Sequence, residues 1–350
     1  MEELERIKNI EPIDWMIYKK IQQHFDKMGK PLRSLGKMET IMAQIGAIER
    51  TEQIDISRKG LIIMCADNGV VEEGVTQTGQ EVTGIVAENF LDEKSCVAIM
   101  CKRCKVDLFP IDIGMVKDTR RVEKRKKMYG TKNLAKGPAM NKEQAVYAIC
   151  QGINLVKELR EAGYKILATG EMGIGNTTTS SAVASVLLQK DPKLITGRGA
   201  GLSTEGLQRK IAAIEQGIKV NKPDAQDPID VLRKVGGLDI AGLSGVFLGG
   251  AIYGIPVLID GFISAVAALV ATRINPLTKE YMIASHISKE PAMTSVLQAL
   301  EKEAMLTMDM SLGEGSGAVA TFPILDMAAD IYYNMSSFDE IGVDTYRPLI

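Results

Sequence analysis

The chain has 350 residues, of which 45% are hydrophobic and 25% charged, and its formal net charge is −2. This length accommodates one large α/β domain with a smaller accessory part. The near-neutral charge and an aromatic content of only 5% exclude a nucleic-acid-binding surface. The first residues lack the apolar core of a signal peptide, and the 5 cysteines are an odd number, so we expect a protein of the reducing cytoplasm.

Short apolar runs alternate with helical patterns along most of the chain. The runs predicted as strands span residues 60–66, 106–114, 164–170, 255–261 and 281–287. The helical patterns comprise one or two helices in 81–104, followed by 141–163, 176–190, 203–221 and 262–274. This alternation is typical of a parallel sheet covered on both faces. We therefore predict an α/β fold with three layers around a mostly parallel, Rossmann-like sheet.

The two ends of the chain have helical patterns and no run typical of a buried strand. We expect residues 1–55 to form a small helical subdomain that packs with residues 325–350. Residues 56–324 then form the α/β catalytic domain. A dimer surface is a further role considered for the helical subdomain.

Two stretches of unusual composition have competing interpretations. Residues 240–259 are 20 uncharged residues with GxxxG spacings, but Gly254 and Pro256 divide them into a helix and a short strand, which we favour over a membrane span. Residues 117–133 are strongly basic, and we favour a solvated loop over a segment that attracts an anionic substrate.

The segment 167–181, with Glu171 near its start, joins a predicted strand to a helix through closely spaced glycines. A backbone of this kind approaches a ligand closely, and the free amides and positive dipole end of the following helix suit a phosphate. Gly173 and Asn176 are candidates for that site. No Lys follows the glycines as in a Walker motif, and GxGxxG is missing. The alternative is an ordinary turn in which Asn176 or Thr177 caps the helix.

A second glycine-rich loop, at residues 197–201, precedes the helix that carries Lys210. Gly199 lies within this loop, and Lys210 would supply the point charge that a phosphate requires, although a lysine on an amphipathic helix is more often solvated.

Glu314 lies between two glycines in the sequence SLGEGSG. Both neighbours lack side chains, so a substrate ring can reach the carboxylate, which suits a general base. Backbone amides would stabilise the anion and burial would disfavour it, and the alternative is a loop or capping glutamate.

Histidine and cysteine patterns favour structural roles. His286 follows a predicted strand, and with His24 as the only other histidine we do not expect a histidine-based metal site. The C-x4-C-x2-C spacing of Cys96, Cys101 and Cys104 matches some iron–sulfur proteins, but the thiols fall on a helical pattern, so we interpret them as small apolar residues.

In this order, the segments resemble the nicotinate-nucleotide–dimethylbenzimidazole phosphoribosyltransferase family of cobalamin nucleotide-loop assembly. The matching motifs are KPLRSLGKMETI (30–41), ADNGVVEEGVTQTGQEVT (66–83), GEMGIGNTTTSSA (170–182), ITGRGAGLSTEGLQRK (195–210), residues 227–269, SHISKEP (285–291) and LGEGSGA (312–318). They extend over nearly the whole chain.

The resemblance implies transfer of the 5-phosphoribosyl group of nicotinate mononucleotide to 5,6-dimethylbenzimidazole or a related base, by a homodimeric enzyme without metal or other cofactor. It implies Glu314 as the general base and Glu171 as a residue near the ribose. The remaining implied residues are Gly173, Asn176, Gly199, Lys210 and Ser288 for the phosphate and ribose, and Gln80, Met172 and Leu312 for the acceptor base.

The chain departs from the family pattern at three points. Arg33 replaces a glycine, Asn68 replaces a frequent histidine, and SHISKEPAM lacks the EPGH ending, which leaves the preferred acceptor (benzimidazole, phenol or purine) open. A nucleotide-binding subunit without catalysis and a nicotinamide-dependent oxidoreductase are the alternatives; the intact glutamates speak against the first and the missing GxGxxG against the second.

Overall fold

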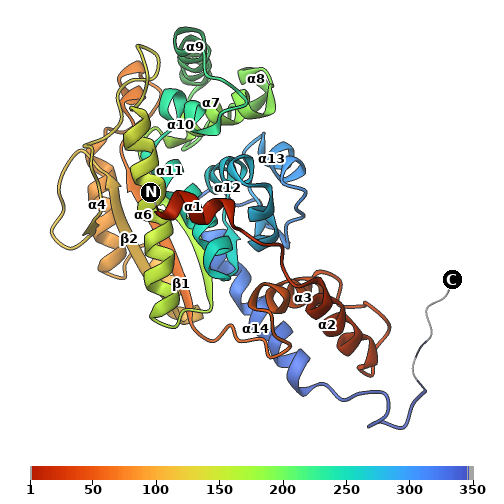
Figure 1. Ribbon diagram of the computed structural model, residues 1–350. Helices are drawn as coiled ribbons and strands as arrows, with labels where there is room; N and C mark the ends of the chain where they lie inside the picture. Colours follow the sequence, from red (N-terminus) through yellow and green to blue (C-terminus); the bar gives the residue numbers. More distant parts are fainter. Residues whose placement is uncertain (1, 345, 347–350) are drawn as a thin grey trace.

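A six-stranded parallel sheet forms the centre of the structure, a computed structural model that describes residues 2–344 and 346 (Figure 1). Its strands, in spatial order, are β3 (Glu123–Lys124), β2 (Val106–Gly114), β1 (Lys59–Ala66), β4 (Ile166–Met172), β5 (Val257–Ile259) and β6 (Met282–Ala284). The chain order reverses between β1 and β4. In open sheets of this type, ligands bind outside the carboxyl ends of the strands at such a reversal.

Helices cover both faces of the sheet, as the sequence predicts. One face packs against α6 (Lys142–Glu161), α11 (Leu238–Tyr253) and α12 (Phe262–Ile274), and the other against α4 (Glu81–Leu91), α5 (Cys96–Cys104) and α14 (Ser316–Asn334). Alternate residues of β1 enter the two cores: Ile62 and Met64 face the first set, and Leu61 and Ile63 face the second. The three-layer α/β fold is therefore confirmed.

The remaining elements lie around this body. They are α7 (Asn176–Leu188), α8 (Pro192–Ile195), α9 (Thr204–Asn221), α10 (Pro228–Val235), α13 (Met293–Ala299), the 3-10 helices η1 (Gly69–Glu73) and η2 (Pro276–Tyr281), and a small parallel pair β7 (His286–Ile287) and β8 (Leu306–Thr307). Helices α7 to α10 gather at one end of the molecule (Figure 1). That group holds both glycine-rich loops.

The uncharged stretch 240–259 forms most of α11 and all of β5, as predicted. Its glycines bring α11 close to α6: a Cβ on Gly245 would overlap the carbonyl oxygen of Ile149, and one on Gly152 that of Gly242. The GxxxG spacing therefore serves packing between helices within the protein. Among residues 2–344 and 346, no helix combines the length and apolarity that crossing a bilayer requires.

The helical ends of the chain divide into two parts. Helices α2 (Trp15–Lys27) and α3 (Lys37–Glu49) pack with the C-terminal part of α14, where the Phe25 and Tyr332 rings lie 5.3 Å apart (Figure 1). Helix α1 (Glu2–Lys8) instead lies by α11, and the Ile7 carbonyl accepts a hydrogen bond from Asn275. Helix α14 is continuous across the predicted boundary at residues 324 and 325.

The basic stretch 117–133 is more ordered than the predicted solvated loop. It contributes β3 to the sheet edge, and the Lys126 ammonium is buried 2.7 Å from a carboxylate oxygen of Asp112. The exposed Arg121 pairs with Glu88 and Asp92. Several positive charges of the stretch are therefore engaged with the protein's own carboxylates.

Arg33 has a left-handed backbone, with φ of 55°, at the position where the family pattern has glycine. A left-handed conformation costs a residue with a Cβ about 1–2 kcal/mol, partly offset by the larger entropy of glycine in the unfolded chain. We expect Arg33→Gly to raise the free energy of unfolding by about 0.5–1 kcal/mol in urea titrations. Arg33→Ala, which keeps the Cβ, is the control, and equal stability of the two variants would contradict this explanation.

Candidate active site

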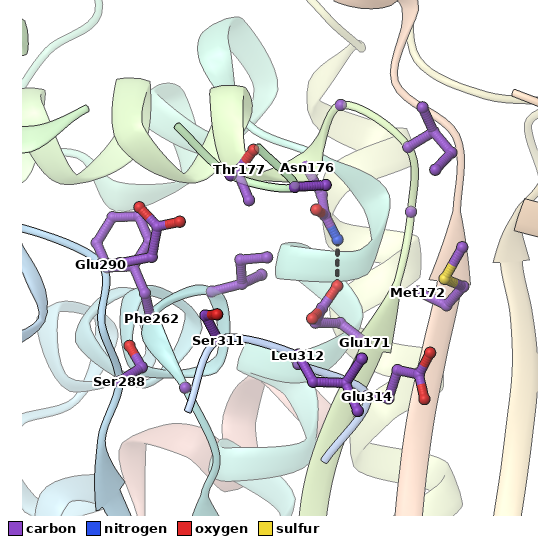
Figure 2. Close-up of a pocket in the computed structure, with 18 of the residues that line it drawn as sticks. Glu171, Met172, Asn176, Thr177, Phe262, Ser288, Glu290, Ser311, Leu312 and Glu314 are labelled. Atoms are coloured by element: carbon purple, nitrogen blue, oxygen red, sulfur yellow. Dashed lines mark hydrogen bonds between the residues drawn. The ribbon is translucent and has the colours of Figure 1, made fainter. Parts of the chain in front are cut away.

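A cavity of about 330 Å³ opens at the carboxyl ends of β4, β5 and β6 (Figure 2). Its walls come from segments far apart in the sequence. The lining residues fall within the ranges 75–78, 171–177, 198–202, 260–264, 286–290 and 311–314, although Gly201, Ile287 and Lys289 do not line the cavity. The cavity thus lies at the carboxyl ends of the strands, on the β4 side of the reversal in strand order, and it joins the glycine-rich segments that the sequence singles out.

The loop that carries Glu314 has a left-handed backbone at three consecutive residues. The φ angles are 80° at Gly313, 61° at Glu314 and 91° at Gly315. A Cβ on Gly315 would lie 2.5 Å from Leu61 Cδ1, and one on Gly170 would lie 2.5 Å from the Glu314 carbonyl oxygen. The glycines therefore let this loop rest directly on the end of β4, and the strained glutamate between them is typical of a functional residue.

The Glu314 side chain is half-buried in the cavity wall. Within the described part of the chain, its Oε2 atom is shielded from solvent and has no hydrogen-bond partner. Burial raises the pKa of Glu314, and the negative charge of Asp260 raises it further. The result is a carboxylate that is more basic than an ordinary glutamate and free to bond to a ligand.

Asp260 connects the end of β5 to the start of α14. Its carboxylate accepts hydrogen bonds from the Gly315 amide at 3.1 Å and the Ala318 amide at 3.0 Å. The N-cap residue of α14, Gly315, has no side chain that could accept hydrogen bonds from the free amides at the start of the helix. Asp260 accepts them instead, and its negative charge lies at the positive end of the helix dipole. Asp260 thus fixes the loop that presents Glu314 and also supplies the charge that raises its pKa.

Glu171 is a second buried carboxylic acid, near the carboxyl end of β4. The Asn176 amide donates a hydrogen bond to it, and the backbone amide of Glu314 faces it. Burial raises the pKa of Glu171 well above its ordinary value, and the negative charges of Asp239 and Asp260 raise it further. Figure 2 shows Glu171 between Met172 and Glu314 on one side and Ser288 and Glu290 on the other.

The turn after β4 brings the cavity wall close to β1. A Cβ on Gly173 would overlap the Ala66 carbonyl oxygen, and Gly175, with φ of 92°, is the N-cap of α7. The Asn176 side chain turns back to Glu171 instead of capping its own helix. The alternative of an ordinary capped turn is therefore wrong for Asn176, whose amide positions an acid.

Lys210 is completely buried behind the cavity wall. Its ammonium donates hydrogen bonds to Thr177 Oγ1 at 2.8 Å and to the Gly197 carbonyl at 3.1 Å. Burial lowers the pKa of Lys210 to about 8. Gly199 has φ of 54°, and a Cβ there would lie 3.4 Å from the Lys210 Nζ atom. The cation therefore lies just beneath a backbone that lines the cavity, and it is not solvated.

Ser288 and His286 line the same part of the cavity after β6. Both are buried, and Ser288 Oγ has no hydrogen-bond partner among the residues that the structure describes. The His286 Nδ1 atom lies 3.1 Å from Ser285 Oγ and 4.0 Å from a carboxylate oxygen of Asp260. The serine hydroxyl is thus available to a ligand, whereas the imidazole is held by its neighbours.

The structure brings most of the predicted site residues together. Those lining the cavity are Glu171, Met172, Gly173, Asn176, Gly199, Ser288, Leu312 and Glu314. Lys210 lies directly behind the wall. Gln80 does not line the cavity, and its side-chain amide donates a hydrogen bond to the Asn68 carbonyl at 3.1 Å. Asn68 itself is fully buried outside the cavity.

Two acids of the cavity were not selected from the sequence. Asp260 lies at the carboxyl end of the predicted strand 255–261, a position that could have indicated a site residue, and Glu290 lies within the SHISKEP motif. The three cysteines at 96, 101 and 104 all lie on α5, and no cluster of three or more His, Cys, Asp or Glu suited to a metal was found in residues 2–344 and 346.

Comparisons with known proteins agree on one family. A family model described as phosphoribosyltransferase matches residues 10–343. Nicotinate-nucleotide–dimethylbenzimidazole phosphoribosyltransferases from Acetivibrio thermocellus and Ruminiclostridium cellulolyticum are each 46% identical, over 97% and 99% of this chain and 96% and 99% of their own. The solved structure of the enzyme of that name from Thermus thermophilus has a TM-score of 0.88 and 34% identity, and the match covers 95% of this chain and 99% of that one.

Proposed function

Because this chain belongs to the nicotinate-nucleotide–dimethylbenzimidazole phosphoribosyltransferase family, we propose that it transfers the 5-phosphoribosyl group of nicotinate mononucleotide to 5,6-dimethylbenzimidazole or a related base. The products are the α-ribazole 5′-phosphate and nicotinate. The observation that carries the proposal is the pair of buried, unpartnered atoms in one cavity, Glu314 Oε2 and Ser288 Oγ, among the residues that the structure describes.

The ligand would lie across the cavity with its phosphate near Ser288 and its reacting rings near Glu314. Gly199 and the buried Lys210 add a backbone amide and a positive charge to the phosphate end. Met172 and Leu312 add apolar surface for the acceptor ring at the other end. Glu171, between the two ends in Figure 2, would orient the ribose.

The reaction requires a base that takes a proton from the acceptor, whereas the positively charged pyridinium leaving group departs without protonation by an acid. The acceptor nitrogen attacks C1′ of the ribose and forms a new C–N bond, while the electron pair of the old bond returns to the pyridinium nitrogen and neutralises its charge. The N–H proton of the acceptor passes to the Glu314 carboxylate. The raised pKa of Glu314 improves it as a base, and the nearby acid Glu171 is still more strongly biased toward its neutral form by burial.

The proposal is tested by offering the purified protein nicotinate mononucleotide with benzimidazoles, phenols and adenine, and separating the products by chromatography. We expect nicotinate and an α-riboside phosphate in equal amounts, with the benzimidazoles as the preferred acceptors. Binding of the nucleotide without product would instead support a non-catalytic nucleotide-binding subunit.

The charge of Asp260 gives a prediction about pH. Loss of activity is expected as pH falls through the raised pKa of Glu314, because the base becomes protonated. Asp260→Asn removes a charge that raises this pKa, so the acid limb of the kcat/KM profile should move to lower pH. Asp330→Asn, which removes an exposed charge from α14 outside the cavity, is the control. An unmoved limb, or one at higher pH, in Asp260→Asn would contradict this role.

We also propose that the protein is a homodimer that works in the cytoplasm. Exposed apolar side chains on α2 and α14, including Trp15, Met16, Met327 and Tyr333, support an interface at the helical end of the molecule. Sedimentation equilibrium measures the mass, and a monomer at micromolar concentration would contradict the proposal.

A further inference from the structure

Glu290 is a cavity-lining acid for which the proposed function has no role. It follows the Ser288 hydroxyl by two residues, and Figure 2 places it on the side of the cavity that also holds Ser288 and Thr177. This is the end at which we place the phosphate of the substrate. An anionic side chain at an anion-binding position requires an explanation, because like charges in a partly buried site repel each other strongly.

Glu290 rests on the loop that separates it from Lys210. A Cβ on Gly197 would overlap the Glu290 carboxylate, and the Gly199 backbone amide faces that carboxylate. From the opposite side, Lys210 donates to the Gly197 carbonyl. The acid and the cation therefore hold the same short loop between them.

The electrostatic partners of Glu290 are those that a bound phosphate would have. Burial raises the pKa of Glu290, while the Lys210 charge acts in the opposite direction, and Glu290 in turn favours the charged form of Lys210. Arg198 also lines the cavity, but its guanidinium donates to the Leu202 carbonyl and to Thr204. Lys210 and the Gly199 amide thus remain the groups that an incoming anion and Glu290 would share.

We propose that the Glu290 carboxylate takes the place of the substrate phosphate in the ligand-free enzyme, and that the phosphate displaces it from the Gly199 amide on binding. This inference rests on the proposed function for the identity of the substrate. Glu290 then keeps the buried Lys210 protonated between turnovers and lowers the affinity of the site for phosphate. The effect would hasten release of the phosphorylated product and limit capture of free phosphate.

The alternative is that Glu290 binds the substrate itself. Its carboxylate would then accept hydrogen bonds from the ribose hydroxyls, as acids do in many nucleotide sites. The two roles predict opposite effects of removing the charge. As a stand-in anion, Glu290 weakens binding of every phosphate-bearing ligand. As a ribose ligand, it strengthens binding of nucleotide and nucleoside alike.

The test is calorimetric binding of three probes to wild type and Glu290→Gln at pH 7: nicotinate mononucleotide, nicotinate riboside and inorganic phosphate. We expect Glu290→Gln to bind the mononucleotide and inorganic phosphate about tenfold more tightly, and the riboside with unchanged affinity. Glu215→Gln, which removes one exposed negative charge from α9, the helix of Lys210, should leave all three affinities unchanged. Equal or weaker binding of the mononucleotide by Glu290→Gln would overturn the inference.

A second measurement uses the unmodified protein. A crystal structure with nicotinate mononucleotide should show the phosphate on the Gly199 amide and the Glu290 side chain turned away from it. A Glu290 carboxylate still on that amide beside the bound nucleotide would also overturn the inference. Because product formation by wild type is assayed separately, failure of this inference is distinguishable from failure of the proposed function.

Discussion

Glu314→Gln is expected to lower kcat for phosphoribosyl transfer by about 10³-fold, the usual range for loss of a positioned general base. The substitution keeps the shape of the side chain and removes its ability to accept a proton. Nucleotide binding should change by less than about threefold, because the phosphate is held at the other end of the cavity. Stopped assays with 5,6-dimethylbenzimidazole give kcat, and calorimetry gives the dissociation constant of nicotinate mononucleotide.

The matched control is Glu171→Gln, since the chain offers a second carboxyl group in the same cavity. Burial and two neighbouring acids raise the pKa of Glu171 well above its ordinary value, so an uncharged amide resembles its favoured form. We expect this variant to retain kcat within about tenfold, well short of the loss expected for a missing base. The reverse order, with Glu171→Gln the more damaged, would assign the base to Glu171.

Lys210→Met is expected to weaken nicotinate mononucleotide binding by about 10²-fold, the value of a charge-assisted contact of about 1.5–3 kcal/mol. Methionine fills the volume of the buried stem and removes the charge next to Gly199 and Thr177. Nicotinate riboside, which has no phosphate, should bind wild type and variant equally. Calorimetry with both ligands therefore separates a loss of phosphate recognition from general damage to the site.

A control for Lys210→Met lies on the same helix. Lys219 is exposed near the end of α9, and Lys219→Met should leave both affinities unchanged. Equal weakening of the riboside and the mononucleotide by Lys210→Met would show that the lysine supports the cavity as a whole. It would then not be a specific counter-charge for phosphate.

Local sequence patterns predict the positions of the central strands and of several helices well. The runs 60–66 and 106–114 correspond to β1 and β2, and the pattern at 262–274 corresponds to α12. The predicted strand 164–170 is shifted by two residues from β4 at Ile166–Met172, and two others are longer than those observed: 255–261 becomes β5 at Val257–Ile259, and 281–287 is divided between β6 and β7 at Ser285. The apolar pattern continues into loops that are buried without pairing, so periodicity alone overestimates the strand length.

The site is less accessible to sequence analysis because tertiary contacts define it. The glycines around Glu314 mark a strained loop, yet nothing local shows that Asp260 holds that loop by its amides. The buried position of Lys210 is likewise invisible in an amphipathic pattern. Gln80 is the reverse case, a residue that a sequence motif suggests for the site but that lies outside the cavity. Its side chain donates a hydrogen bond to the Asn68 carbonyl.

The central claim is that Glu314 removes a proton from the acceptor nitrogen. The most direct measurement compares wild type and Glu314→Gln in single-turnover rates with benzimidazoles of increasing N–H acidity. If Glu314 is the base, the deficit of the variant should shrink steadily as the acceptor loses its proton more readily. A deficit that stays constant across the series would contradict proton transfer to Glu314 and would leave it a positioning role only.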